Sequence, residues 1–528
     1  GPSGARRPPP PPRGSVRDRA ASPDGGVVEC VLSNGMKVCY KATRFLDDEV
    51  QFKGFALGGV SQVQHADSGM LLSAKMSARI ADEVGVFGVP PGDVLDMIAG
   101  MRVSVNTEIG TYSRGFAGEC SPSDLEAAFQ MLHLLFRSQL LPSIEGLEVL
   151  MRMMREQVDN QFRDPQAVFA QRCLSLVTSD APFYRPIKQH ELSQVDADYA
   201  CAFFKHCFSD PSRFTLVLSG NLDEAVLTEY LEKYIASIPA GANASGGLPD
   251  MPAERDALSS VVAEFPSARR CEVVRMSMVD PLCCTKVTLP VEIAPGPEEL
   301  EERTLLGHAM QVLESRLVER MRFELGAIYS VSASIDFSFA NPSSLEPLAG
   351  TASISFTCDP SDISQLVAKV FSELAALQAE GPTQQDVETR VEISQREHET
   401  SCKHNTWWLE RIAAAYTSRH PPPAAGGGGG GVQAGLDRME EVRVRVLRDL
   451  TRERMRGVYV SYFRDLDRYT VVSLRPTLYT RVVSALREKA RETDLPPEAV
   501  AATLLGFALG VGAVLAVAGV RLLRAWRR

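Results

Sequence analysis

Three features that mark common functional classes are missing from this sequence of 528 residues. The formal net charge is -10, and no stripe of Lys and Arg interleaved with aromatic residues occurs. This argues against a nucleic-acid partner, because phosphate contacts need a basic face. The eleven cysteines form no C-x-x-C pair, which excludes a zinc ribbon and favours free thiols in a reducing compartment. No Ser/His/Asp or phosphate-loop pattern is found either.

Histidine pairs with a metal-binding spacing are also missing. None of the eight histidines begins an H-x-x-E-H or H-E-x-x-H motif. Those spacings place two imidazoles one helical turn apart around zinc, beside a glutamate that takes a proton from the metal-bound water. His398 and His404 are six residues apart, so they lie on different faces of a helix. The sequence therefore predicts that this chain holds no zinc, no zinc ligands and no general base.

The most informative stretch that is present runs from Leu317 to Val331, where the hydrophobic period changes. Upstream, apolar residues recur every three or four positions, as on one face of a helix: Leu306, Met310, Leu313, Leu317 and Met321. Gly326 suits a helix end, because glycine adopts the left-handed conformation without steric cost. Downstream the period is two, which predicts a half-buried strand with one side formed by Tyr329, Val331, Ala333, Ile335, Phe337 and Phe339.

The chain also repeats itself. Cys120-Ser121-Pro122-Ser123-Asp124-Leu125 matches Cys358-Asp359-Pro360-Ser361-Asp362-Ile363, and in each case a strand enters and an amphipathic helix leaves. A second match joins Phe208, Asp210, Arg213, Phe214 and Thr215 to Phe463, Asp465, Arg468, Tyr469 and Thr470. In the first copy, Asn34-Gly35 between two alternating runs predicts a β-hairpin. We therefore expect an α+β fold of two homologous domains, each with a mostly antiparallel sheet and helices packed on it.

Composition divides the chain into segments. Pro, Gly and Arg dominate the start, Gly and Pro mark a linker, and a run of glycines interrupts the second copy. The predicted order is a disordered linker (1–26), the first repeat (27–239), a linker (240–256), the second repeat (257–480) with a Gly-rich insertion (420–435), a juxtamembrane segment (481–498), a transmembrane helix (499–520) and a basic tail (521–528).

The expectation of a transmembrane helix depends on Ala499 to Val520, which carries no charge. Its 22 residues would form a helix about 33 Å long, sufficient for a hydrocarbon core of about 30 Å. Arg521 and Arg524 follow it, and a similar number of basic residues precedes it, so the orientation stays open. We expect the membrane to be a partner of the chain through this helix.

Arg322, Gly326 and Tyr329 form an R-x-x-x-G-x-x-Y element at the predicted helix-to-strand corner. From the residues alone, Arg322 also fits a solvated cation at a helix end, and Tyr329 fits a core strand aromatic. With the repeat, the element resembles the C-terminal half of the pitrilysin/insulinase family of inverted-zincin metallopeptidases, close to its PqqL-like members. Two further segments support the resemblance: T-R-F-L-D-D-E-V-Q-F with Gly58-Gly59-Val60-Ser61, and Asn405-Thr406-Trp407-Trp408-Leu409.

The resemblance implies that this chain is the zinc-free half of a zinc metalloendopeptidase, closing over peptide substrate while its own N-terminal half holds the zinc. Arg322 and Tyr329 would then bind substrate, and both repeats would be non-catalytic peptidase-like domains. The alternative is an inactive relative that serves as a membrane-anchored binding or scaffold subunit. We expect the lobes to lie in a reducing aqueous compartment. The sequence does not identify the organelle; a chloroplast or a mitochondrion would fit.

Overall fold

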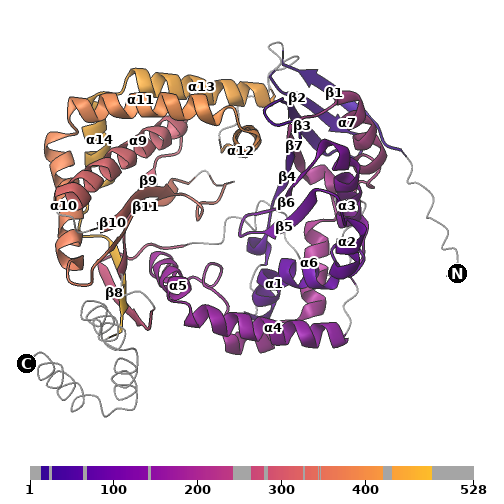
Figure 1. Ribbon diagram of the computed structural model, residues 1–528, viewed down its shortest axis with the longest axis horizontal. Helices are drawn as coiled ribbons and strands as arrows, with labels where there is room; N and C mark the ends of the chain where they lie inside the picture. The colour runs from indigo at the N-terminus through magenta and orange to yellow at the C-terminus, as the bar shows by residue number, and fades with distance from the viewer. Residues whose placement is uncertain are drawn as a thin grey trace, which may run out of the picture.

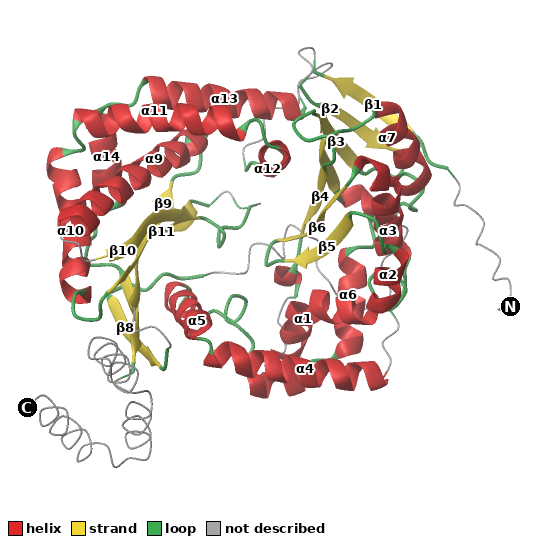
Figure 2. Ribbon diagram, viewed as in Figure 1, coloured by secondary structure: helices red, strands yellow, loops and turns green. Residues whose placement is uncertain are grey.

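The computed structural model describes residues 13–22, 26–63, 68–140, 144–241, 263–278, 283–324, 328–342, 344, 346–419 and 431–477. They form two lobes, one indigo to magenta and the other red to yellow in Figure 1. Each lobe has one sheet with helices on its outer side (Figure 2). The fold is therefore α+β with two helix-bearing sheets.

The first sheet has seven strands in the order β1-β2-β3-β7-β4-β6-β5. Their bounds are Val16–Ala21, Val28–Leu32, Lys37–Ala42, Val50–Leu57, Val103–Ile109, Ser113–Cys120 and Thr215–Gly220 for β1 to β7. All neighbours are antiparallel except β3 and β7. The predicted hairpin joins β2 to β3, and Gly35 in its turn has a φ of 88°, which glycine adopts without strain.

The second sheet repeats this arrangement. Its order is β10-β11-β9-β12-β8, with bounds Arg270–Met276, Cys283–Ile293, Ile328–Asp336, Leu348–Cys358 and Thr470–Pro476 for β8 to β12. Only β8 and β12 run parallel. Strands β8 to β12 therefore have the same order and the same relative directions as β3 to β7. Both sheets are mixed, with a single parallel pair each among the described strands.

Most helices of each lobe cover the outer face of its sheet. In the first lobe they are α1 Ser68–Val84, α2 Pro91–Met97, α3 Leu125–Arg137, α4 Ile144–Arg163, α5 Pro165–Val177, α6 Ala197–Cys207 and α7 Glu224–Tyr230. In the second lobe they are α9 Glu299–Leu317, α10 Ile363–Glu380, α11 Gln384–Ser401, α12 Asn405–Thr417, α13 Val432–Arg448 and α14 Arg452–Tyr462. Each lobe buries its own core: Phe52 and Phe129 belong to the first, and Leu313 and Tyr459 to the second. Burial of this apolar surface is the main force that holds each lobe together.

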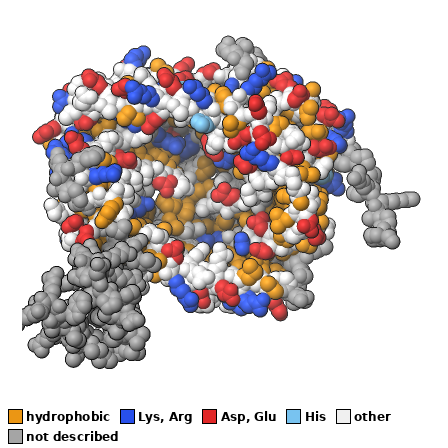
Figure 3. Space-filling model, in the orientation of Figure 1, with side chains coloured by type: hydrophobic (Ala, Val, Ile, Leu, Met, Phe, Trp, Pro, Cys, Tyr) orange, Lys and Arg blue, Asp and Glu red, His pale blue; other side chains and the backbone are white. Residues whose placement is uncertain are grey.

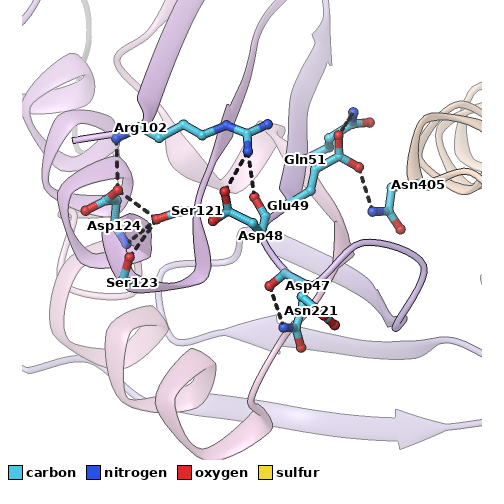
Figure 4. A network of polar contacts seen from close by, with 10 residues as sticks. All are labelled: Asp47, Asp48, Glu49, Gln51, Arg102, Ser121, Ser123, Asp124, Asn221 and Asn405. Atoms are coloured by element: carbon cyan, nitrogen blue, oxygen red, sulfur yellow. Dashed lines mark hydrogen bonds and ion pairs between the residues drawn. The ribbon is translucent and has the colours of Figure 1, made fainter. Parts of the chain in front are cut away.

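Each lobe also lends one helix to the inner face of the other lobe's sheet. Helix α5 packs on β12 and β8, and α12 packs on β7 and β4. At the start of α12, Asn405 is 2% exposed. Its side chain accepts a hydrogen bond from Thr43 Oγ1 (2.6 Å) and donates one to Glu49 Oε2 (2.7 Å), as Figure 4 shows for the contact with Glu49. The two segments that supported the family resemblance thus meet across the lobes.

Three sequence predictions meet the structure differently. Residues 1–26 were predicted to be disordered, but Val16–Ala21 form β1, because they complete the hydrogen bonding of β2 and Arg19 reaches Glu224. Helix α13 begins at Val432, so the last four residues of the predicted Gly-rich insertion are helical. The predicted transmembrane segment 499–520 lies outside the described residues. Within the described part of the chain, no helix is long and apolar enough to cross a membrane.

Candidate functional site

The inner face of the second sheet carries a field of hydroxyl groups, of which those of β10 are exposed and those of Ser353 and Thr288 are buried. Ala352, Ile354 and Phe356 of β11 are fully or almost fully buried in the second core, so the residues between them face the other way. Strand register places serines and threonines of three strands next to one another on that inner side: Ser330, Ser332 and Ser334 of β10, Ser353, Ser355 and Thr357 of β11, and Thr288 of β9. Figure 3 shows that the molecule is hollowed between the lobes.

The corner that leads into β10 is a π-helix rather than a plain helix end. Helix α9 continues into the π-helical segment η6, Val318–Glu324, which carries Arg322. The side chain of Arg322 is exposed. Short π-helical segments are rare and are frequent at functional sites. Gly326, which was predicted to end the helix, lies outside the described residues.

A buried carboxylate holds this corner in place. The side chain of Glu373 on α10 is 6% exposed and pairs with Arg316 (3.3 Å) and Lys369 (3.1 Å). Arg320 of η6 approaches the same carboxylate at 3.8 Å, and Arg316 also reaches Asp386 of α11. Because a buried charge is tolerated only when it is paired, these contacts fix the end of α9 and η6 against α10 and α11.

Tyr329 does not lie on the core side of β10, where the alternation placed it. The pairing of β10 with β11 shifts between Ile328 and Ser330, so Tyr329 is the extra residue of a β-bulge. A bulge re-aims the side chains around it: Ile328 stays buried, whereas Tyr329 is 64% exposed. The strand also ends at Asp336 rather than Phe339. The prediction that Tyr329 shares a face with Val331 and Ala333 was therefore wrong.

A second contact joins α9 to the edge of β10. Glu314 of α9 accepts a hydrogen bond from the backbone N–H of Ala333 at 2.7 Å. Among the described strands, β10 is at the edge of its sheet, and an unpaired edge invites association with other chains. Glu314 therefore satisfies one edge donor and fixes the distance between α9 and the strand that carries Tyr329.

The described residues contain no cluster of His, Cys, Asp and Glu that could hold a metal ion. Acidic and histidine residues that could in principle bind a metal have structural contacts instead. Glu191 pairs with Arg185, which lowers its pKa to about 2. His308 is buried, which lowers its pKa to about 4. His398 packs edge-on against Trp407. Within the part of the chain that the structure describes, the residues therefore do not form a zinc site.

Sequence reasoning found Arg322 and Tyr329 but missed the surroundings that expose them. The structure places both at the surface of one corner, on the two sides of residues 325–327. The π-helical turn and the bulge gave no signal in the hydrophobic pattern. The hydroxyl field did give one, because Ser330, Ser332 and Ser334 alternate in the sequence.

Comparisons with known proteins show the family of the chain. A family model described as the Peptidase M16 inactive domain matches residues 194–393. The protein named zinc protease PQQL-like of Arabidopsis thaliana is 36% identical over 428 residues, which cover 81% of this chain and 41% of that protein. The chain belongs to the M16 peptidase family. This confirms the resemblance drawn from the sequence.

Two further relatives agree. The probable zinc protease PqqL of Haemophilus influenzae is 23% identical over 345 residues, covering 65% of this chain and 34% of that protein. The crystal structure of the periplasmic protease PqqL from Escherichia coli superposes with a TM-score of 0.67 at 14% identity, covering 90% of this chain and 48% of that one. This M16 chain therefore spans less than half the length of each of these three proteins.

Proposed function

We propose that this chain is the zinc-free half of an M16 metalloendopeptidase, and that it binds peptide substrate for cleavage by an upstream half. One observation carries the proposal. A relative named a zinc protease is 36% identical to the chain, yet the chain covers only 41% of it, and the described residues offer no metal site. The zinc of such an enzyme would then be held by a part of the protein that this sequence does not include.

The chemistry assigned to this chain is hydrogen bonding to the peptide. Arg322 offers a guanidinium with several N–H donors, and Tyr329 offers one hydroxyl donor. Both could donate to carbonyl oxygens of an extended peptide or to the oxyanion that develops on one of them during cleavage. Fixed donors act most strongly on that developing charge. The Glu373 contacts fix the end of α9 that leads to Arg322, and the bulge turns Tyr329 away from the core.

The test is turnover of a quenched fluorescent peptide by the full-length protein. We expect Arg322→Ala and Tyr329→Phe each to lower kcat/KM by about 100-fold, while zinc content stays at the wild-type value because neither residue is a ligand. Wild-type turnover in both variants would remove the assignment of these residues. Absence of turnover in the wild type would instead support the inactive, scaffold-like relative.

We also propose that residues 499–520 anchor the protein in a membrane, with the lobes in a reducing compartment such as that of a chloroplast or mitochondrion. The uncharged run of these residues supports the first part. All eleven cysteines are free, which supports the second. Carbonate extraction of the protein, with and without the residues after Asp494, tests the anchor: we expect only the shortened form to be released.

A further inference from the structure

A cavity of about 650 Å³ lies beside β10, between α9, α13 and the end of α12. Three arginines from three different segments line it: Arg303 of α9, Arg419 after α12, and Arg438 of α13. Glu299 is the acidic residue among the lining residues. The described lining residues thus carry three positive charges and one negative charge.

Two of the arginines are fixed by other contacts. The side chain of Arg419 is 7% exposed and lies 3.3 Å from Glu299 Oε2. It also donates to the carbonyl oxygen of Ser344 through Nε at 3.1 Å. Arg438 donates to the carbonyl oxygen of Pro297 at 2.7 Å. The wall of the cavity thus contains fixed guanidinium groups, and among its described lining residues Glu299 is the one carboxylate against three arginines.

Arg303 differs from these two because it is exposed within the cavity. Its guanidinium lies over the ring of Phe337, 5.2 Å from the ring centre, which holds it at the β10 side of the cavity. Partial burial lowers the pKa of Arg303; Glu299 opposes this effect, and the neighbouring Arg419 adds a smaller lowering effect. An anion in the cavity would offset the cost of burying this charge.

The cavity also borders the peptide-binding strand. Ala333, Ser334 and Ile335 of β10 line it, and they lie a few residues beyond Tyr329. Beside these residues, the Glu314 carboxylate accepts a hydrogen bond from the backbone N–H of Ala333. A peptide that extends from Tyr329 along β10 would therefore reach Arg303 with a residue some distance from the bond that is cut.

We propose that this arginine cavity binds a carboxylate of the peptide, either an acidic side chain or a C-terminal carboxylate, and so selects acidic substrates. This inference rests on the proposed function, since it adds a charge preference to the same peptide-binding wall. Planar guanidinium groups bind carboxylates through paired N–H donors, which gives both affinity and orientation.

The experiment measures fluorescence anisotropy of labelled, unstructured peptides of equal length with the chain. One peptide is neutral with an amidated C-terminus, one carries internal glutamates with an amidated C-terminus, and one is neutral with a free C-terminal carboxylate. We expect one of the carboxylate-bearing peptides to bind the wild type about tenfold tighter than the neutral peptide. The tighter of the two identifies the source of the carboxylate.

The variant Arg303→Ala should abolish this preference while leaving affinity for the neutral peptide unchanged. Arg448→Ala is the matched control, because it removes the same charge from an exposed ion pair with Asp449 at the end of α13; it should keep the preference.

Raising the ionic strength should weaken the preference in the wild type, since salt screens accessible charges. Equal binding of all three peptides, or a preference retained in Arg303→Ala, would overturn the inference. Failure of every peptide to bind the wild type would instead count against the proposed function.

Discussion

The two lobes place the same helix-to-strand corner in the same topological position and build it differently. In the first lobe, α1 ends at Val84, Gly85 follows with a φ of 112°, and β5 pairs with β6 in an unbroken register. In the second lobe, α9 runs into a π-helix, and β10 carries a bulge at Tyr329. A repeated fold thus keeps its strand order, while the irregular turns of one copy expose the two side chains that we assign to substrate.

The inner faces of the two sheets differ in the contacts that they make with the helix from the other lobe. Helix α12 lies on the first sheet through contacts that are buried, such as those of Asn405. Helix α5 packs on β12 and β8 of the second sheet. It buries Cys173 and Val177, and its Arg172 forms an exposed ion pair with Glu272. The hydroxyl field of β10 and β11 lies on the remaining strands. The first sheet thus contributes buried polar contacts between the lobes, and the second presents the surface that we propose to bind peptide.

Removal of Glu373 should have the largest effect on the second corner. The variant Glu373→Ala leaves Arg316 with only Asp386 in a largely buried site, so we expect a loss of about 3 kcal/mol in the free energy of unfolding, measured by urea denaturation. Glu392→Ala, which breaks an exposed pair with Arg396, is the control and should cost less than about 0.5 kcal/mol. Similar losses in both variants would show that the Glu373 contacts do not fix the corner.

The contacts by which α12 and α5 join the two lobes can be compared directly. Asn405→Ala leaves Thr43 and Glu49 without their partner in a buried contact, so we expect a loss of about 2 kcal/mol. Arg172→Ala removes an exposed pair with Glu272 and should cost about 0.5 kcal/mol. Thermal unfolding of the two variants side by side tests this order. A larger effect of Arg172→Ala would reverse the assignment of α12 as the stronger brace.

Acid should lower the stability of the second lobe through a buried histidine of α9. Helix α1, its counterpart in the first lobe, contains no histidine. His308 lies on α9, and burial lowers its pKa to about 4, below the value of about 6.5 that it has when unfolded. Its neutral form therefore contributes stability that is complete above pH of about 6.5 and is lost as the pH falls toward 4. His308→Gln should flatten this part of the profile of melting temperature against pH. An unchanged profile would exclude His308 as its source.

Particular residues show how far the sequence could predict this molecule. Asn34-Gly35 predicted the hairpin of β2 and β3, because glycine suits the left-handed turn that the strands require. The matched segments at Cys120 and Cys358 predicted the repeated strand-to-helix junctions. The exchange of α5 and α12 could not be predicted, since amphipathic periodicity shows which face of a helix is buried but not which lobe buries it. Tyr329 was placed on the wrong face because one extra residue in a strand resets the alternation.

Binding of a peptide by single variants at equivalent positions tests the central claim most directly. Val103 pairs with Cys120 as Ile328 pairs with Cys358, and Ser104 follows Val103 in the chain as Tyr329 follows Ile328, but β5 has no bulge there. We predict that Tyr329→Phe weakens binding of an uncleaved peptide by about tenfold, the value of one lost hydrogen bond, while Ser104→Ala binds as the wild type does. Equal affinities in the two variants would contradict the assignment of the second corner to substrate.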